Sequence, residues 1–269
     1  MISEQRCHAC GHRELLVGQP PSLPSPVCRN CGAQWANPNL SMATRAPIPS
    51  HLEYATKMVE AITGHGQDCV AANDHYGTLI IRVADGAGGV AGSGEAAEII
   101  CESELCDNVM VFPSPASMPY PPDVFLSSVS RRLCSLSKKG PPRGSASAVI
   151  IEIEADGWIS AASVGDCKAR IFNDGQPHME LTALQNRRPL LGEAGADPVT
   201  FEGKFEDGEM LIAATDGLWK YAGLPRITKI VRSNPLLPLD QLADALIDSA
   251  RLPTRALQDD IALAIVMRR

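Results

Sequence analysis

The sequence predicts an α+β fold, because its expected strands gather in blocks and its expected helices in pairs. From Ser145 to Phe172, apolar residues recur with a period of two between Asp-Gly turns, which is typical of an antiparallel meander. Residues 94–108 and 123–138 instead carry apolar side chains at helical spacing. Strands and helices therefore do not alternate one by one, as they would in an α/β fold.

The length and composition restrict the class of protein. The chain has 269 residues, of which 45% are apolar and 4% aromatic, so one large domain or two unequal ones can form around Ala, Val, Ile and Leu. Its formal charge of −7 argues against a general nucleic-acid or anionic-membrane surface. It contains no apolar run of the roughly 18 residues that a membrane span needs and no signal-peptide pattern. We therefore expect a cytoplasmic protein without membrane contacts.

Two Cys-x2-Cys-Gly motifs lie near the N-terminus, separated by residues 11–27. This spacing is typical of a structural zinc site with four thiolate ligands. The ligands would be Cys7, Cys10, Cys28 and Cys31. The segment has few apolar residues, so metal binding would supply much of its stability. We expect a zinc ribbon at residues 1–38 and a linker at 39–52. Two redox-active cysteine pairs are the alternative, although no thioredoxin-like strand–helix pattern surrounds them.

The remaining five cysteines lie in apolar or helical patterns, which predicts buried free thiols rather than disulfides. They are Cys69, Cys101, Cys106, Cys134 and Cys167. The total of nine cysteines is odd and fits poorly with a fully paired disulfide framework.

The main domain is expected at residues 53–269, and residues 79–89 are its central feature. A run of branched apolar residues predicts a buried strand that ends at Asp85, followed by glycines and a helix for which Ser93 is the expected N-cap. A carboxylate at a strand tip, next to backbone without side chains, suits a phosphate or a metal ion. A tight strand-to-helix turn capped by Asp85 is the alternative.

Three more aspartates lie where strands are expected to begin or end. They are Asp68, Asp216 and Asp259. Carboxylates at strand ends can converge on one pole of a layered sheet, and hard divalent cations prefer such oxygen ligands. The alternative is that each is an ordinary turn or strand-edge residue. Asp260, the neighbour of Asp259, is expected to face solvent or to cap the last strand.

The other elements are expected from the same patterns. In chain order they are a strand or helix at 54–63, a hairpin turn at 74–77, a proline-rich loop at 112–122, meander strands at 148–153, 158–164 and 168–172, a strand at 209–215, a helix at 240–250 and a strand at 261–267. The helix at 123–138 should bury Val124, Leu126, Val129, Leu133 and Leu136.

Six motifs in one order resemble the metal-dependent serine/threonine phosphatases of the protein phosphatase 2C type. They are Gln67-Asp68, Asp85-Gly86-Ala87-Gly88-Gly89, Gly165-Asp166, Leu181-Thr182 with Leu191-Gly192, Thr215-Asp216-Gly217-Leu218-Trp219 and Asp259-Asp260. Each motif alone is common, whereas six in this order are specific. The resemblance covers the chain from about residue 58 to the end. It implies a four-layer α-β-β-α sandwich of two antiparallel sheets flanked by helices, with metals at one end, and it favours a strand at 54–63.

The resemblance also implies a centre with two Mn2+ or Mg2+ ions. In this centre Asp85 bridges the ions, the Gly86 carbonyl binds one of them, and Asp216 and Asp259 bind the other. A pair of cations about 3.5–4 Å apart can activate a bridging water and neutralise the negative charge of phosphoryl transfer. No covalent intermediate is required. The predicted function is hydrolysis of phosphoserine and phosphothreonine in proteins.

Two further acids have roles that the resemblance suggests. Asp68 would hold water molecules beside the ions. Asp166 resembles an aspartate that binds a third, weaker ion in the family, and a purely structural role is the alternative. The partners implied are a phosphorylated protein and its cognate serine/threonine kinase.

The chain departs from the family pattern close to the expected site. Thr63 stands where the family has a phosphate-binding arginine, and Gln67 stands where it often has a glutamate. Ala87 replaces a histidine that sometimes serves as a proton donor. Arg82 and His65 are the nearby candidates to replace the arginine.

These departures leave other functions open. A pseudophosphatase or phosphoprotein-binding adaptor, with the zinc ribbon as a docking module, is the main alternative. Only residues 183–190 stand where the family has a longer flap, so substrate selection would be looser or supplied by another protein. A nucleic-acid role for the ribbon is disfavoured, because Trp35 is its one stacking residue.

Overall fold

The protein is described by a computed structural model. The described residues are 2–6, 13–17, 52–75, 77–102, 121–139 and 144–269. The four cysteines of the predicted ribbon and Cys106 lie outside these residues, as does the predicted linker up to residue 51. The chain divides into two compact units, which are described separately. In the smaller one, strands β1 (Ile2–Arg6) and β2 (Arg13–Val17) form an antiparallel pair.

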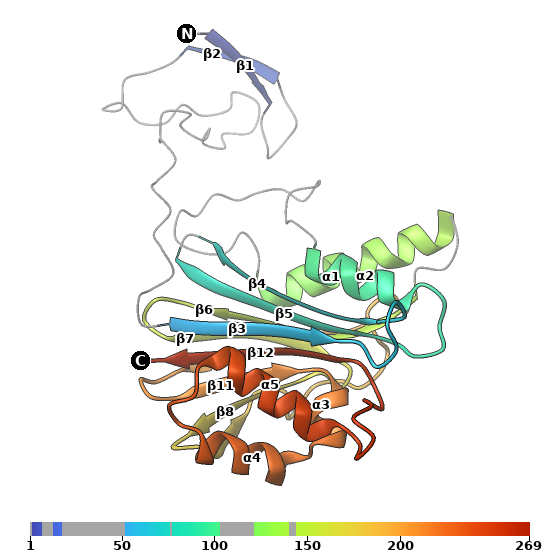
Figure 1. The fold of residues 1–269 in the computed structure, drawn as a ribbon. Coiled ribbons are helices and arrows are strands. Elements are labelled where there is room, and N and C mark those ends of the chain that lie inside the picture. Colours follow the sequence, from blue (N-terminus) through green and yellow to red (C-terminus); the bar gives the residue numbers. More distant parts are fainter. Residues whose placement is uncertain (1, 7–12, 18–51, 76, 103–120, 140–143) are drawn as a thin grey trace. The chain divides into compact units, whose positions relative to one another are not determined.

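The described part of the larger unit contains two five-stranded antiparallel sheets. The first sheet has the order β10-β7-β6-β5-β4, and the second has the order β3-β12-β11-β8-β9 (Figure 1). The strands are β3 (Leu52–Val59), β4 (Asp68–His75), β5 (Thr78–Gly86), β6 (Ala146–Ile153), β7 (Trp158–Val164), β8 (Lys168–Asn173), β9 (Gln176–Glu180), β10 (Val199–Lys204), β11 (Met210–Ala214) and β12 (Ile261–Arg268).

Helices cover the outer face of each sheet. Helices α1 (Ser93–Glu102) and α2 (Pro122–Lys139) pack on the first sheet. Helices α3 (Asp216–Tyr221), α4 (Leu224–Ser233) and α5 (Leu239–Ala250) lie on the side of the second (Figure 1). The predicted four-layer arrangement of helices and sheets is therefore confirmed. No helix among the described residues has the length and apolar character needed to cross a membrane.

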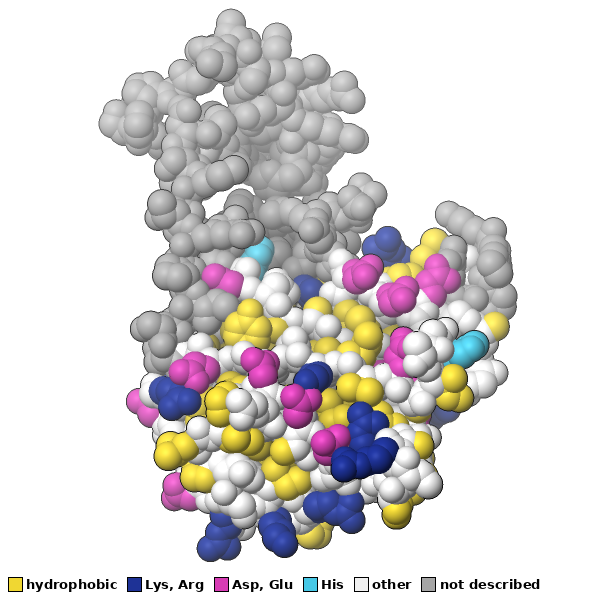
Figure 2. Space-filling view, viewed as in Figure 1, with side chains coloured by type: hydrophobic (Ala, Val, Ile, Leu, Met, Phe, Trp, Pro, Cys, Tyr) yellow, Lys and Arg dark blue, Asp and Glu magenta, His cyan; other side chains and the backbone are white. Residues whose placement is uncertain are grey.

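The apolar residues form two buried clusters, one between the sheets and one between the second sheet and its helices. Branched residues of β5 and β6, such as Ile81, Val83 and Ile151, are fully buried in the first cluster. Leu242 and Leu246 of α5 belong to the second. Burial on both faces explains why β5 reads as an almost continuous apolar run. On the face shown in Figure 2, several basic side chains lie at the end where α4 lies, and others are mixed with acidic ones over the remainder.

The predicted meander is wrong at one connection. Strand β8 does not pair with β7, because it joins the second sheet between β11 and β9. The chain crosses between the sheets just after β7, where Gly165 has φ +99° and a Cβ would lie 2.4 Å from Ser147 Oγ. Only glycine fits this position. Strand β10, which was not predicted, takes the place beside β7.

Two smaller expectations at helices α1 and α2 are also wrong. The side chain of Ser93 does not cap α1, because the helix already includes this residue and its buried Oγ has no hydrogen-bond partner among the described residues. In α2, Val124 is 36% exposed and Phe125 is buried instead. Leu126, Val129 and Leu133 are buried as predicted.

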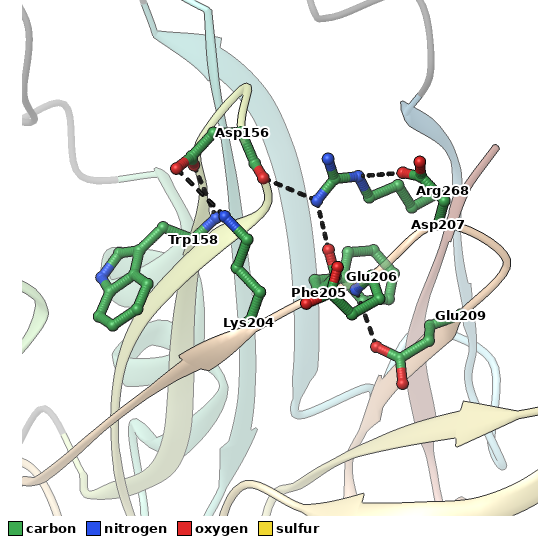
Figure 3. Close-up of polar contacts among 8 residues, drawn as sticks. All are labelled: Asp156, Trp158, Lys204, Phe205, Glu206, Asp207, Glu209 and Arg268. Atoms are coloured by element: carbon green, nitrogen blue, oxygen red, sulfur yellow. Dashed lines mark hydrogen bonds and ion pairs between the residues drawn. The ribbon is translucent and has the colours of Figure 1, made fainter.

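The end of the sandwich opposite the strand-tip aspartates is held together by Arg268 of β12 (Figure 3). Its Nη1 donates hydrogen bonds to Phe205 O and, at 2.8 Å, to Asp156 O, and its Nε pairs with Asp207 Oδ1 at 2.8 Å. Asp156 lies in the turn of the first sheet, and it also pairs with Lys204. The Arg268 side chain is only 12% exposed, so these bonds join the two sheets through a largely buried guanidinium.

We expect Arg268→Met to lower the free energy of unfolding by about 1–3 kcal/mol, because two carbonyl acceptors lose their charged donor. Arg269→Met is the matched control, since Arg269 pairs with Glu53 at 2.8 Å but both side chains are about half exposed. Such an exposed pair contributes about 0–1 kcal/mol. Urea unfolding of both variants checks this expectation, and equal losses would contradict it.

Glu152 of β6 is a second buried charged group. Its side chain lies near Arg82 without forming an ion pair, and its Oε1 has no hydrogen-bond partner among the described residues. Burial, together with the charge of Glu154, raises the pKa of Glu152 to about 8. The folded protein therefore binds this proton more tightly than the unfolded chain does, and stability is lost as the pH rises from about 4.5 to about 8.

We expect Glu152→Gln to be more stable than the wild type at pH 8, by on the order of 2 kcal/mol, and to lose most of this advantage at pH 5. The physical reason is that glutamine does not ionise when buried. Urea unfolding at both pH values measures the difference. Glu202→Gln, on the exposed side of β10, is the control for the same change of charge at the surface. An advantage of equal size at both pH values would contradict the assignment.

Candidate active site

The predicted aspartates meet in one cavity of about 240 Å3 at one end of the sandwich. Its wall comes from both sheets and from the loops that join them. The lining residues are Gln67, Asp68, Asp85, Gly86, Ala87, Gly88, Val90, Ser147, Asp166, Arg188, Leu190, Asp216, Asp259 and Asp260. All five predicted acids of the metal centre, Asp166 included, belong to this set.

Strand pairing brings the acids of the first sheet together. Asp68 begins β4 and lies directly opposite Asp85 near the end of β5, so the antiparallel register sets their spacing. Ser147 of β6 lies opposite Asp85 on its other side. Its Oγ accepts hydrogen bonds from Asp166 N and Cys167 N, both at 2.8 Å. Ser147 therefore holds Asp166 beside Asp85, a role that its sequence context did not reveal.

Thr215 connects the acids of the second sheet to those of the first. It follows β11 and is fully buried. Its N donates to Ala262 O at 3.0 Å and its Oγ1 accepts from Ala262 N at 3.0 Å. Its side chain is also hydrogen-bonded to Asp68. Asp216 follows Thr215, and Asp259 lies just before β12. The network therefore places both acids beside Asp68 and Asp85.

Gly86 and Gly217 are required by close backbone contacts. A Cβ on Gly86 would lie 2.6 Å from Ser93 O and 2.8 Å from Gln67 O. A Cβ on Gly217 would lie 2.0 Å from Asp260 O. Neither position has room for a side chain. The glycines of the two Asp-Gly motifs therefore allow the strands, and the acids at their ends, to approach one another.

The crowded carboxylates disfavour one another's charge. Burial, with the charge of Asp260, raises the pKa of Asp68 to about 7. Burial and the neighbouring acid Asp68 raise the pKa of Asp85 to about 9. Burial also raises the pKa of Asp216. A divalent cation would remove this repulsion, so the donor set of the cavity fits hard metal ions.

The acids do not form a closed set of protein ligands. Among the described residues, no group of three or more His, Cys, Asp and Glu side chains is arranged to hold an ion by itself. Mg2+ usually keeps several of its waters and takes only one or two carboxylates from the protein. The cavity therefore fits ions that are held partly through water, and the role of each acid as a ligand stays a prediction.

Asp260 was expected to face solvent or to cap the last strand. Its carboxylate instead accepts two hydrogen bonds from the backbone of a distant segment. Its Oδ1 accepts a hydrogen bond from Ala61 N and its Oδ2 one from Gln67 N, both at 2.7 Å. These bonds tie the segment between β3 and β4 to the start of β12. They therefore position Asp68, the residue after Gln67, and no local sequence pattern signals contacts across nearly 200 residues.

The two candidates for the missing arginine do not reach the cavity. Arg82 is buried under α1, where its Nη1 donates to Cys101 O at 3.1 Å and its guanidinium lies over the ring of Phe125. His65 is exposed and does not line the cavity. Among the described residues, the arginine that lines it is Arg188, which belongs to none of the sequence motifs.

We expect Asp260→Ala to destabilise the protein by roughly 1–3 kcal/mol, because two partly buried amides lose their acceptor. Hydrogen exchange should quicken at the Ala61 and Gln67 amides. Asp260→Asn, which keeps one acceptor oxygen, should recover part of the loss, and Asp240→Ala on the surface of α5 is the control. Unchanged exchange at both amides would show that Asp260 does not position this segment.

Comparisons with known proteins identify chains that share this fold. Among curated proteins, "Probable protein phosphatase 2C 1" of Oryza sativa subsp. japonica is 23% identical over 244 residues, which is 86% of this chain and 70% of the rice protein. The serine/threonine phosphatase of S. agalactiae has a TM-score of 0.64 at 20% identity over 81% of this chain and 100% of that one. RsbX in complex with magnesium has a TM-score of 0.60 at 16% identity over 82% and 96%. These structures share the fold.

The family model described as "Stage II sporulation protein E (SpoIIE)" matches residues 82–269, which is more than half of the chain. The match spans β5 to β12 and thus contains every acid of the cavity except Asp68. The chain belongs to the SpoIIE family.

Proposed function

We propose that this chain is a metal-dependent serine/threonine protein phosphatase of the protein phosphatase 2C type. The observation that carries the proposal is the convergence of five predicted acids from both sheets on one cavity. These acids are far apart in the chain and occur in the order of the phosphatase motifs. If these acids were ordinary strand-edge or turn residues, they would have no reason to lie together in one cavity, where their mutual repulsion is costly.

The relatives favour an enzyme over the adaptor alternative. The rice relative is named as a probable phosphatase, and the S. agalactiae structure is that of a serine/threonine phosphatase. The structure of RsbX contains magnesium. The adaptor alternative depends on two replacements, Thr63 for the family's arginine and Ala87 for its histidine. Neither replacement removes an acid from the cavity.

Bound Mn2+ or Mg2+ would supply activation of water and neutralisation of the charge on the phosphoryl group. Asp85, the Gly86 carbonyl, Asp216 and Asp259 are the residues that would hold two such ions. Asp68, fixed opposite Asp85 and bonded to Thr215, would accept hydrogen bonds from water in the cavity. In this arrangement the protein positions the reacting groups, as phosphoryl transfer requires, and forms no covalent bond to the substrate.

Several finer predictions accompany this proposal. A third ion at Asp166, a structural Zn2+ on the four N-terminal cysteines, and a ribbon at 1–38 that docks a partner remain predictions from the sequence. The same holds for the boundary at residue 53, for a cognate kinase as partner and for a cytoplasmic location. A phosphorylated protein is the substrate class that the proposed activity requires.

We expect Asp85→Ala and Asp216→Ala to reduce Mn2+-dependent turnover of a phosphothreonine peptide on the order of 100-fold or more, because each removes a charge that would hold an ion. Calorimetric titration with Mn2+ should show weaker binding in both variants. Asp240→Ala, an exposed acid of α5, is the control and should keep wild-type values.

Two results would contradict the proposal. If both variants kept full turnover, the cavity would not be the active site. If the wild-type protein bound phosphopeptides and Mn2+ but released no phosphate at any metal concentration, the adaptor reading would replace the enzyme.

A further inference from the structure

The cavity has one positively charged side chain for many negative ones. Its described wall contains the acids named above and Arg188, with no lysine and no second arginine among the described lining residues. A phosphomonoester carries up to two negative charges and needs hydrogen-bond donors on its oxygens. If the cavity takes such a substrate, as the proposed function states, Arg188 is the side chain with the matching charge.

Arg188 is accessible to solvent, and a hydrogen bond to Glu193 also holds its side chain in place. Its side chain is 68% exposed, and its Nη1 donates a hydrogen bond to Glu193 Oε1 at 2.7 Å. A guanidinium has five N–H donors, so this bond leaves donors for a ligand.

The backbone that carries Arg188 is attached to the sheet beside the acids. Leu191 and Ala146 of β6 exchange two backbone hydrogen bonds of 3.0 Å. Gly192 N donates to Ser130 Oγ of α2 at 3.1 Å. Glu193 Oε2 accepts from Leu190 N at 2.9 Å, so the same glutamate orders the loop and the guanidinium. The loop is therefore attached to β6 and α2 just after Arg188. Ser147, which follows Ala146 in β6, lies opposite Asp85.

Other described cations near the acids are engaged elsewhere or lie off the wall. Arg82 is buried against Cys101 and Phe125, as described above. Lys220 of α3 approaches Asp216 Oδ2 at 3.9 Å and lies over the ring of Tyr221, outside the lining of the cavity. Lys168, whose charge also acts on Asp216, lies outside the lining as well.

We propose that Arg188 binds the phosphoryl oxygens of the substrate and that Glu193 positions it. A planar guanidinium can contact two phosphate oxygens at once, which a lysine ammonium cannot do with the same geometry. Arg188 thus acts as a specificity-determining residue for phosphomonoesters. It lies in the short segment 183–190, where related phosphatases have a longer flap.

The test compares Arg188→Ala and Arg188→Lys with Arg187→Ala. Arg187 is the adjacent exposed arginine and does not line the cavity, so it controls for charge and for folding. With p-nitrophenyl phosphate and Mn2+, Arg188→Ala should raise KM about 10- to 100-fold and change kcat less. It should raise the inhibition constant of inorganic phosphate to a similar extent. Arg188→Lys should lie between, and Mn2+ binding should not weaken in any of the three variants.

Calorimetric titration of the Mn2+-loaded protein with inorganic phosphate separates this inference from the proposed function. Weaker phosphate binding in Arg188→Ala than in Arg187→Ala supports the role of Arg188, even if the wild type shows no turnover. Equal KM values and equal phosphate affinities in Arg188→Ala and Arg187→Ala would overturn it, whereas the phosphatase assignment would stand on the turnover of the wild type.

Discussion

The crowding of carboxylates at one end of two packed sheets is the constraint on which the rest of this molecule depends. Buried acids repel one another and lose hydration, so their proximity opposes folding until a cation or a proton neutralises them. The raised pKa values of Asp68 and Asp85 express this repulsion. A fold that keeps such groups together needs a stable framework elsewhere, and the strands of this sandwich provide it.

That framework is built almost entirely from small and branched side chains. Residues of β5, β6, β11 and β12 are buried on both faces, so each sheet is covered on its outer side by helices and on its inner side by the other sheet. Few aromatic residues are needed, because Ala, Val and Ile fill the thin space between the sheets. The opposite end is closed by Arg268 and its carbonyl partners (Figure 3).

Contacts between distant segments give the site its geometry. Thr215 joins β11 to β12 and reaches Asp68, and Asp260 joins the start of β12 to the segment before β4. Ser147 holds the crossing connection at Asp166. Each of these polar residues is hydrogen-bonded to main-chain amides, so each satisfies buried backbone groups and orients an acid at the same time. The loop with Arg188 adds the opposite charge at the rim of the same cavity.

The sequence by itself determined the fold class, the strand-tip position of Asp85 and five of the acids that line the cavity. These features are local, because an apolar run followed by Asp-Gly predicts both a strand and the residue at which it ends. The tertiary structure alone decided that β8 leaves the sheet of β7, that Asp260 faces inward and that Arg188, rather than Arg82, reaches the cavity. Such features depend on partners far along the chain. The alternation of apolar residues along a strand is the same whether the strand pairs with its neighbour in sequence or joins another sheet.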